Sequence, residues 1–232
     1  MPVFRLTDKI SFPSPELADD EGLLAVGGDM SEKRLLLAYS MGIFPWYSDS
    51  YPILWWSPDP RLVLFPEELK VSRSLRQTIK KNVFKITFDR AFDSVIRNCA
   101  KVKRKGEKGT WITPEMIEAY TRLHESGYAH SVESWFDGRL VGGLYGVSLG
   151  TAFFGESMFA NMSNASKAAF VTLVEYLRKL NFRVIDCQIT TSHLVSLGAR
   201  EIPRSEFLKI LKSSLKEDTK KGRWSLIEDT PD

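Results

Sequence analysis

Two carboxylates and one amide interrupt apolar segments of the sequence, and together they could position and activate a nucleophile. Glu156 lies in the run FFGESMF, and Asp186 and Gln188 lie in FRVIDCQIT. A carboxylate in such surroundings must be paired, hydrogen-bonded or catalytic, because an isolated buried charge is costly. A salt bridge from Glu156 to a nearby Arg or Lys is the purely structural alternative. Breaks in an otherwise consistent pattern are where functional sites are expected.

Asp186 and Gln188 lie two residues apart on a strand predicted over 182–189. Both side chains should therefore project from one face, while Cys187 points the other way into packing. In that geometry Asp186 orients and polarises the Gln188 amide, and the amide oxygen accepts a hydrogen bond from an attacking amine. The alternative is a polar pair that only joins the sheet to a loop.

An apolar stripe runs along the helix predicted over 166–180. Its members recur at the helical spacing typical of a core-facing helix: Phe170, Leu173, Val174, Leu177 and Leu180. Leu173 and Leu177 lie one turn apart and could also wall a pocket. The other walls of that pocket would be Leu144, Phe153 and Met158. The flexible side chain of methionine suits a pocket that admits more than one apolar group.

Basic residues crowd between positions 73 and 108, although the formal net charge of the chain is only +3. A helix predicted over 71–82 carries several of them, and a glycine-containing basic loop follows over 101–108. The helix contributes Arg73, Arg76, Lys80 and Lys81. A basic segment on a nearly neutral chain indicates a local phosphate-binding surface. A solvated helix face followed by a flexible loop is the alternative.

Four prolines and three tryptophans within residues 43–65 argue against regular structure over most of that stretch. Trp46, Trp55 and Trp56 could pack the first part of the chain onto the rest, or line a mouth where a flat group stacks. Packing is expected, because most large aromatic side chains are buried for stability. Trp46, which follows a proline in a loop, is the expected exception.

The order of predicted elements indicates an α+β fold. A small N-terminal domain is expected over residues 1–65 and a larger domain over 66–232, with a loose tail from about residue 216. The larger domain contains helices, an antiparallel meander with a turn at Asp137-Gly138, a crossover helix and a further strand. This order resembles the GNAT acyltransferase fold, in which a splayed sheet opens a cleft between two central strands. Topology alone says little about function.

Composition argues against a membrane-spanning, secreted, disulfide-bonded or metal-binding protein. Hydrophobic residues at 43% and charged residues at 26% describe an ordinary globular chain without a long apolar run or a signal-peptide start. The two cysteines suit a reduced cytoplasm, and the three histidines lack metal-ligand spacings. We expect a cytoplasmic monomer without a disulfide, a metal or a membrane span.

Ordered motifs over about residues 12 to 211 identify a family resemblance. GLLAVGGDM, GIFPWYS, ILWWSPDPRLVLFPE, GTWIT, LVGGLYGV, FFGESMF, NASK and IDCQ resemble the bacterial leucyl/phenylalanyl-tRNA–protein transferases. The resemblance implies transfer of Leu or Phe, with Met as a further candidate, from aminoacyl-tRNA to the N-terminal amine of proteins that begin with Lys or Arg. The product would be marked for N-degron degradation. No ATP, metal or coenzyme is implied, because the aminoacyl ester is already activated.

The resemblance also implies roles for particular residues. It assigns Glu156, Asp186 and Gln188 to the chemistry and to holding the acceptor amine. The pocket for the transferred side chain falls on Leu144, Phe153, Met158, Leu173 and Leu177. Aromatic residues can occupy the last two positions in the family, so leucine there alters the pocket depth. Around the terminal adenosine and the aminoacyl group lie Tyr39, Trp46, Trp111 and Tyr120.

The chemistry of the residues agrees with this implied reaction. The 3′ end of tRNA is single-stranded, so stacking on aromatic rings is the expected mode of capture. The basic helix would contact acceptor-stem phosphates, with the loop over 101–108 as a weaker candidate. An acceptor Lys or Arg needs a nearby anion, which favours Glu156 and Asp186. Holding amine and ester together supplies much of the rate enhancement.

Two other functions remain open from the residues. An acyl-CoA-dependent GNAT enzyme needs an Arg/Gln-x-x-Gly-x-Gly/Ala turn at the start of the crossover helix, and NMSNASK there contains no glycine. A non-enzymatic RNA-binding protein would explain the basic helix and the aromatic residues. It would leave Glu156, Asp186 and Gln188 without a role.

Overall fold

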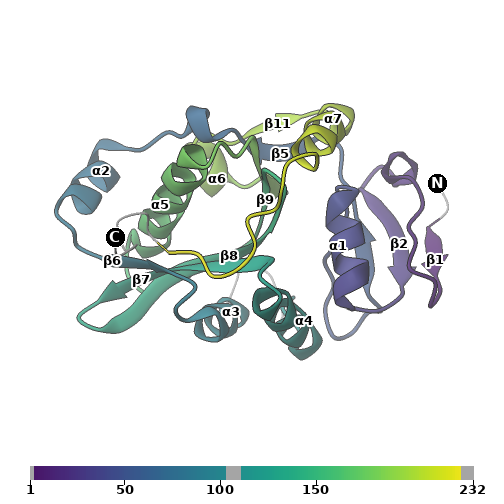
Figure 1. The fold of residues 1–232 in the computed structure, drawn as a ribbon, viewed down its shortest axis with the longest axis horizontal. Coiled ribbons are helices and arrows are strands. Elements are labelled where there is room, and N and C mark those ends of the chain that lie inside the picture. Colours follow the sequence, from purple (N-terminus) through teal and green to yellow (C-terminus); the bar gives the residue numbers. More distant parts are fainter. Residues whose placement is uncertain (1–2, 103–110, 226–232) are drawn as a thin grey trace.

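The computed structural model describes residues 3–102 and 111–225 as two sheets with helices packed against them (Figure 1). The strands of the small sheet are, in spatial order, β1 (Phe4–Leu6), β2 (Leu23–Gly27), β4 (Leu54–Trp56) and β3 (Phe44–Pro45). Those of the large sheet are β11 (Arg200–Ile202), β5 (Arg61–Leu64), β10 (Val184–Gln188), β9 (Ala152–Ala160), β8 (Arg139–Leu149), β7 (Ala129–Phe136) and β6 (Lys85–Phe88). The mixed architecture agrees with the predicted α+β class.

Seven α-helices and two short 3-10 helices accompany the sheets within the described residues. The 3-10 helices are η1 (Pro15–Leu17) and η2 (Pro66–Glu68). The α-helices are α1 (Glu32–Ser40), α2 (Arg73–Lys80), α3 (Phe92–Ala100), α4 (Pro114–Glu125), α5 (Ala165–Lys179), α6 (Ser192–Ser196) and α7 (Arg204–Ser214). The side chains of Ser31 and Thr113 cap the N-termini of α1 and α4. In Figure 1 the small sheet and α1 lie at one end of the long axis, and α2 lies at the other.

The stretch over 43–65 is more regular than expected, because it forms β3, β4 and β5. Proline is tolerated there since β3 is an edge strand of the small sheet, where Pro45 costs no ladder hydrogen bond. β5 pairs with β10 and β11 in the large sheet. The division between the two sheets therefore falls before β5 and not at residue 65.

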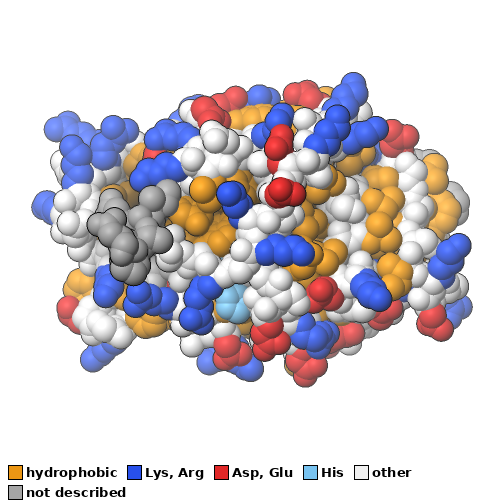
Figure 2. Space-filling view, in the orientation of Figure 1, with side chains coloured by type: hydrophobic (Ala, Val, Ile, Leu, Met, Phe, Trp, Pro, Cys, Tyr) orange, Lys and Arg blue, Asp and Glu red, His pale blue; other side chains and the backbone are white. Residues whose placement is uncertain are grey.

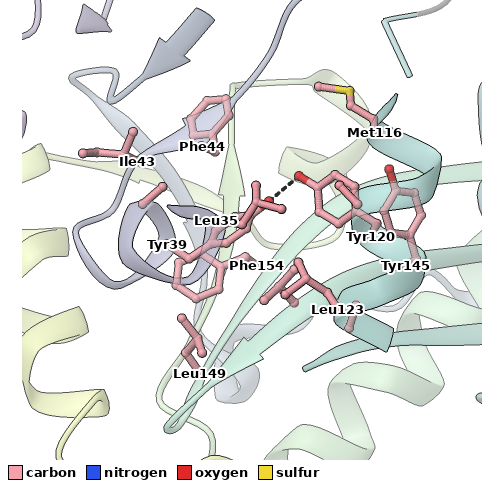
Figure 3. Packing of buried hydrophobic residues seen from close by; sticks show 14 of the residues in the cluster. Leu35, Tyr39, Ile43, Phe44, Met116, Tyr120, Leu123, Tyr145, Leu149 and Phe154 are labelled. Atoms are coloured by element: carbon pink, nitrogen blue, oxygen red, sulfur yellow. Dashed lines mark hydrogen bonds between the residues drawn. The ribbon is translucent and has the colours of Figure 1, made fainter. Parts of the chain in front are cut away.

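One apolar core joins the small sheet and α1 to the large sheet. Tyr39 of α1 and Phe44 of β3 belong to the same buried cluster as Tyr120 of α4 and Phe154 of β9 (Figure 3). A second cluster lies on the other face of the large sheet, where α5 packs against β7 and β8. The N-terminal part of the chain thus supplies side chains directly to the centre of the molecule.

The two central strands of the large sheet diverge. β9 and β10 are parallel and pair only from Val184 opposite Ala152 to Asp186 opposite Phe154. β9 then continues to Ala160 in register with β8, while β10 ends at Gln188. Polar side chains just beyond the last paired residues can therefore face a gap in the sheet.

The described part of the C-terminal tail is held in place, so the expectation of a loose tail from about residue 216 is wrong up to residue 225. Trp224 is 4% exposed, and its ring stacks on His130 with the ring centroids 3.7 Å apart. Its backbone N–H donates to Asp89 Oδ2 at 2.7 Å. A polar composition suggested mobility, but one tryptophan anchors the segment through buried area and a hydrogen bond.

Candidate active site

Glu156 is the centre of a hydrogen-bond network at the point where β9 and β10 separate. The side chain of this glutamate is 8% exposed. Tyr39 Oη donates to Glu156 Oε1 at 2.7 Å, and Tyr120 Oη donates to Oε2 at 2.9 Å. Gln188 Nε2 donates to Oε1 at 3.0 Å. These partners are all neutral, so the network replaces the salt bridge considered from sequence.

Burial changes the pKa values of the carboxyl and phenol groups in this network. It raises the pKa of Glu156 to about 7, although the hydrogen bonds from the two tyrosines and Gln188 each lower that pKa. Burial and the nearby Glu156 charge raise the pKa of Tyr39 and of Tyr120 well above the usual phenol value. The phenols therefore remain protonated donors at neutral pH, while the carboxyl group can exchange a proton in that range.

Asp186 does not face the same way as Gln188, and the prediction of one shared face is wrong. Residues on β10 and β5 shift register between Asp186 and Gln188, which is a β-bulge that breaks the two-residue alternation. Gln188 has a φ of 63°, in the left-handed region. Asp186 Oδ1 accepts a hydrogen bond from the backbone N–H of Gln188 at 3.0 Å. Asp186 thus contacts the backbone of Gln188 and not the side-chain amide.

Asp186 also forms a buried salt bridge with Arg61, which uses both of its carboxylate oxygens. Arg61 Nε and Nη2 donate to its two carboxylate oxygens at 2.8 and 2.7 Å. Both side chains are almost completely buried, with 1% of Arg61 and 0% of Asp186 exposed. This carboxylate is therefore not available as an anion for an acceptor side chain.

A cavity of about 510 Å³ opens beside Glu156 and Gln188. Its volume lies in the range of roughly 300–1,000 Å³ typical of ligand pockets. Of the residues predicted from sequence, it is lined by Trp46, Trp111, Leu144, Phe153, Glu156, Met158, Leu173 and Gln188. The structure thus brings most of the predicted site together around one space.

Three predicted residues lie behind the cavity. Leu177 is not among the residues that line the cavity and lies in the core under α5. Tyr39 and Tyr120 are equally buried, which leaves no ring face for an adenine (Figure 3). Their hydroxyl oxygens lie 2.5 Å apart and both contact Glu156. Their predicted stacking role is replaced by a role in holding the carboxylate.

Sequence reasoning missed several residues of the cavity wall. They include Phe44, Pro45, Tyr145, Phe170, Ile185, Cys187, Ile189, His193 and Leu194. The spacing of the α5 stripe could have indicated Phe170, since it lies one turn before Leu173. Cys187 was expected to point away, and the bulge turns it toward the cavity. Burial raises the pKa of the Cys187 thiol, so that thiol is not activated as a nucleophile.

The predicted basic helix is α2, and its cationic side chains are exposed. Arg73, Arg76, Lys80 and Lys81 all face solvent. Figure 2 shows Lys and Arg side chains gathered over the α2 end of the molecule. The weaker candidate, the basic loop over 101–108, lies almost entirely in residues 103–110, outside the described residues.

The described residues also bear on the requirements of a metal site, a membrane-spanning helix and a disulfide. In the parts of the chain that the structure covers, no three His, Cys, Asp or Glu residues are placed to share a metal ion. Over the same residues, no helix combines the length and apolar character needed to cross a membrane. Neither Cys99 nor Cys187 is part of a disulfide.

A mixed α+β fold with a buried carboxylate–amide pair beside an apolar cavity has the features of a ligand-binding site with a polar centre. Comparison with known proteins gives the family. Residues 63–212 match the model of the leucyl/phenylalanyl-tRNA protein transferase, and residues 28–59 match that of its N-terminal domain. The chain belongs to the leucyl/phenylalanyl-tRNA–protein transferase family, as the motifs predicted, and is a tRNA-dependent aminoacyltransferase.

Individual relatives match over nearly their full length. A leucyl/phenylalanyl-tRNA–protein transferase of Syntrophobacter fumaroxidans is 61% identical, over 97% of this chain and 96% of the relative. That of Anaeromyxobacter sp. (strain Fw109-5) is 59% identical, with the same coverage of both chains. Among solved structures, L-PGS from Bacillus licheniformis is 12% identical with a TM-score of 0.40, over 73% of this chain and 54% of that one. Similarity at that level carries no functional information.

Proposed function

We propose that this protein transfers Leu or Phe from aminoacyl-tRNA to the N-terminal amine of a protein that begins with Lys or Arg. The observation that carries the proposal is the Glu156–Gln188 pair beside an apolar cavity, in a chain of this family. We place the reaction in the cytoplasm, where a monomer with a GNAT-like catalytic domain would mark acceptor proteins for N-degron degradation. Met is a further candidate for the transferred residue.

The cavity would hold the side chain of the transferred residue. Leu144, Phe153, Met158 and Leu173 supply an apolar wall, and the flexibility of methionine fits more than one apolar shape. Trp46 is half-buried at the same cavity, and its ring would stack on the terminal adenosine. The aminoacyl ester would then lie next to the polar pair.

The amine attacks the ester carbonyl carbon, so the C–N bond forms and the C–O bond to the ribose breaks. The proton that the amine loses ends on the departing ribose oxygen. Gln188 uses its Nε2 to donate to Glu156, and its Oε1 is left to accept a hydrogen bond from the incoming amine. The main contribution is orientation of the amine against the ester, which can supply several kcal/mol.

Glu156 is the anion that an acceptor Lys or Arg would meet. Asp186 was the other candidate, but its charge is already neutralised by Arg61. Burial holds the pKa of Glu156 at about 7, so the carboxylate is partly ionised at neutral pH and becomes more so as pH rises. A cationic acceptor side chain would favour the ionised form further.

The test is a transfer assay with radiolabelled Leu-tRNA and peptides that begin with Arg, Lys or Ala, without CoA or ATP. Label on the Arg and Lys peptides alone is the expected result, with the Ala peptide as the matched control. Binding of tRNA without any transfer would favour an RNA-binding protein. Absence of both would overturn the proposal and direct the search to acyl-CoA substrates.

A further inference from the structure

Arg61 is buried at the meeting point of three elements. It begins β5, and its guanidinium lies over the ring of Phe44 from β3 at 4.7 Å. On another side it lies 4.8 Å from the ring of Phe207 from α7. Two aromatic rings restrict the plane of the guanidinium and partly compensate its charge. Its Nη1 has no hydrogen-bond partner among the described residues, so the polar contacts of Arg61 are concentrated on Asp186.

The two parallel hydrogen bonds from Arg61 fix the carboxylate plane of Asp186. Both bonds are short, at 2.8 and 2.7 Å, and they use both oxygens. Oδ1 accepts a third hydrogen bond, from the backbone N–H of Gln188 at 3.0 Å. An aspartate that bonds the N–H two residues along is a standard means of forming a turn.

The turn at Gln188 needs such support. A φ of 63° is unfavourable for a residue with a side chain and persists only when surrounding contacts enforce it. The turn also ends the regular pairing of β10, since Gln188 lies opposite Leu62 after the bulge. The same turn directs the Gln188 side chain toward Glu156, to which Nε2 donates.

We propose that Arg61 is a positioning residue for the transfer reaction, which orients Gln188 by fixing the Asp186 carboxylate that holds the Gln188 turn. The inference rests on the proposed function for the step that Gln188 serves. Arg61 acts through Asp186 and the backbone, since it does not line the cavity. Its contact with Phe44, which does line the cavity, ties the same guanidinium to the cavity wall.

Lysine cannot replace Arg61 in this role. An ammonium group is a point charge that would neutralise Asp186 but could not form two parallel bonds in one plane or stack between two rings. Arg61→Lys therefore keeps the charge balance of the buried pair, but the Asp186 carboxylate is no longer fixed in one orientation. This variant separates loss of orientation from loss of a buried charge.

The experiment measures kcat, KM for an Arg-initiated peptide, tRNA affinity and exchange of the Gln188 backbone amide in the full-length protein. In Arg61→Lys we expect kcat to fall about tenfold to a hundredfold, because small misplacements of a positioning group have effects of that size. The Kd for tRNA should stay within about twofold, since Arg61 is buried and begins β5, which lies away from α2 in Figure 1. The Gln188 amide should exchange about tenfold faster or more, because its hydrogen-bond acceptor is no longer held.

Arg200 provides a matched control. It forms a two-bond ion pair with Glu68 at 2.9 and 3.3 Å and lies over the ring of Phe65 at 4.7 Å. This pair is exposed and does not line the cavity, so Arg200→Lys should leave kcat and Gln188 exchange unchanged. The two variants thus compare the same chemical change at a buried and at an exposed pair.

A second variant separates positioning from stability. Replacing both partners with apolar residues, as Arg61→Met with Asp186→Leu, removes the buried charges together and is often tolerated by the fold. We expect this double variant to unfold near the wild-type temperature and still to transfer slowly. Wild-type kcat in the double variant, or in a folded Arg61→Lys protein, would overturn the inference. If the wild type transfers nothing, the proposed function fails. The positioning role has a separate test: an unchanged exchange rate of the Gln188 backbone amide in Arg61→Lys would overturn it, whether or not the wild type transfers.

Discussion

Gln188 Nε2 donates to Glu156 Oε1 at 3.0 Å across the gap where β9 and β10 stop pairing. Each residue comes from a different strand, so the contact exists only because the two strands diverge just after they have been held in register. An ionised carboxylate can only accept hydrogen bonds, which sets the amide with its nitrogen toward Glu156. The amide oxygen is thereby left for a donor in the cavity, and an amine is such a donor.

Removing either member of this pair should abolish transfer and leave tRNA binding intact. Gln188→Ala removes the acceptor for the amine, and Glu156→Ala removes both the anion and the partner that orients Gln188. Loss of a positioned group in a reaction centre lowers rate by about a hundredfold or more. Single-turnover transfer and tRNA binding are measured on the same preparations. Glu175→Ala, at an exposed glutamate on α5, is the control. Wild-type rates in both site variants would contradict the site.

The two tyrosines that hold Glu156 should set the pH dependence of transfer. Their hydrogen bonds favour the ionised carboxylate, so each lowers the pKa that burial has raised to about 7. Tyr120→Phe removes one of these bonds, and the pKa of Glu156 should therefore rise further. The acidic limb of the kcat/KM profile should shift to higher pH, with more activity lost below pH 7 than above it. Tyr39→Phe should have the same direction of effect.

Tyr51→Phe serves as the control for both tyrosine variants. Tyr51 is 64% exposed and lies in a loop, so the loss of its hydroxyl should leave the pH profile where it is. A profile of Tyr120→Phe that overlays the wild type would show that ionisation of Glu156 does not govern transfer. A shift to lower pH would contradict the direction worked out from the hydrogen bonds.

Much of the architecture could be predicted because it depends on local pattern. Capping residues before α1 and α4, the turn at Asp137-Gly138 and the apolar stripe of α5 all act within a few residues. Part of the apolar wall of the cavity was also predicted, namely Leu144, Phe153, Met158 and Leu173. Leu177 was predicted to line the cavity and does not. Helical spacing predicts which face of a helix is buried, but it does not predict which turns of that face border a cavity.

The parts that were wrong depend on contacts between distant segments. Period-two alternation put Asp186 and Gln188 on one face, but one extra residue in the ladder reverses that relation and cannot be read from alternation. Tyr39 lies 117 residues before Glu156, so no local signal could bring its hydroxyl to that carboxylate. Trp224 likewise anchors a polar tail through a ring stack with His130.

The depth of the cavity should set the preference between Leu and Phe. Leu173 lines the cavity from α5, and Leu173→Ala would enlarge it on that side. Preference for Phe over Leu, as the ratio of kcat/KM values, should rise by about tenfold, since a few methylene groups in an apolar pocket discriminate on that scale. Competition between Leu-tRNA and Phe-tRNA for one acceptor peptide measures the ratio.

Leu177→Ala is the matched control for this prediction. Leu177 lies one turn further along α5 and is equally buried, but it does not line the cavity. It should lose about 2–5 kcal/mol of stability, as buried leucines generally do, with little change in the preference. A preference that moves equally in both variants would mean that softening of α5, and not the cavity wall, controls specificity.

The exposed cations of α2 should determine the salt dependence of tRNA binding. Each phosphate contact that is lost should reduce the slope of log K against log salt by about one or slightly less. Arg76→Ala and Lys80→Ala should therefore weaken binding uniformly for Leu-tRNA and Phe-tRNA, with kcat at saturating tRNA unchanged. Lys209→Ala is the control, because that lysine is exposed on α7, at a distance from α2 along the molecule (Figure 1). An unchanged slope in both α2 variants would mean that the acceptor stem contacts another face of the protein.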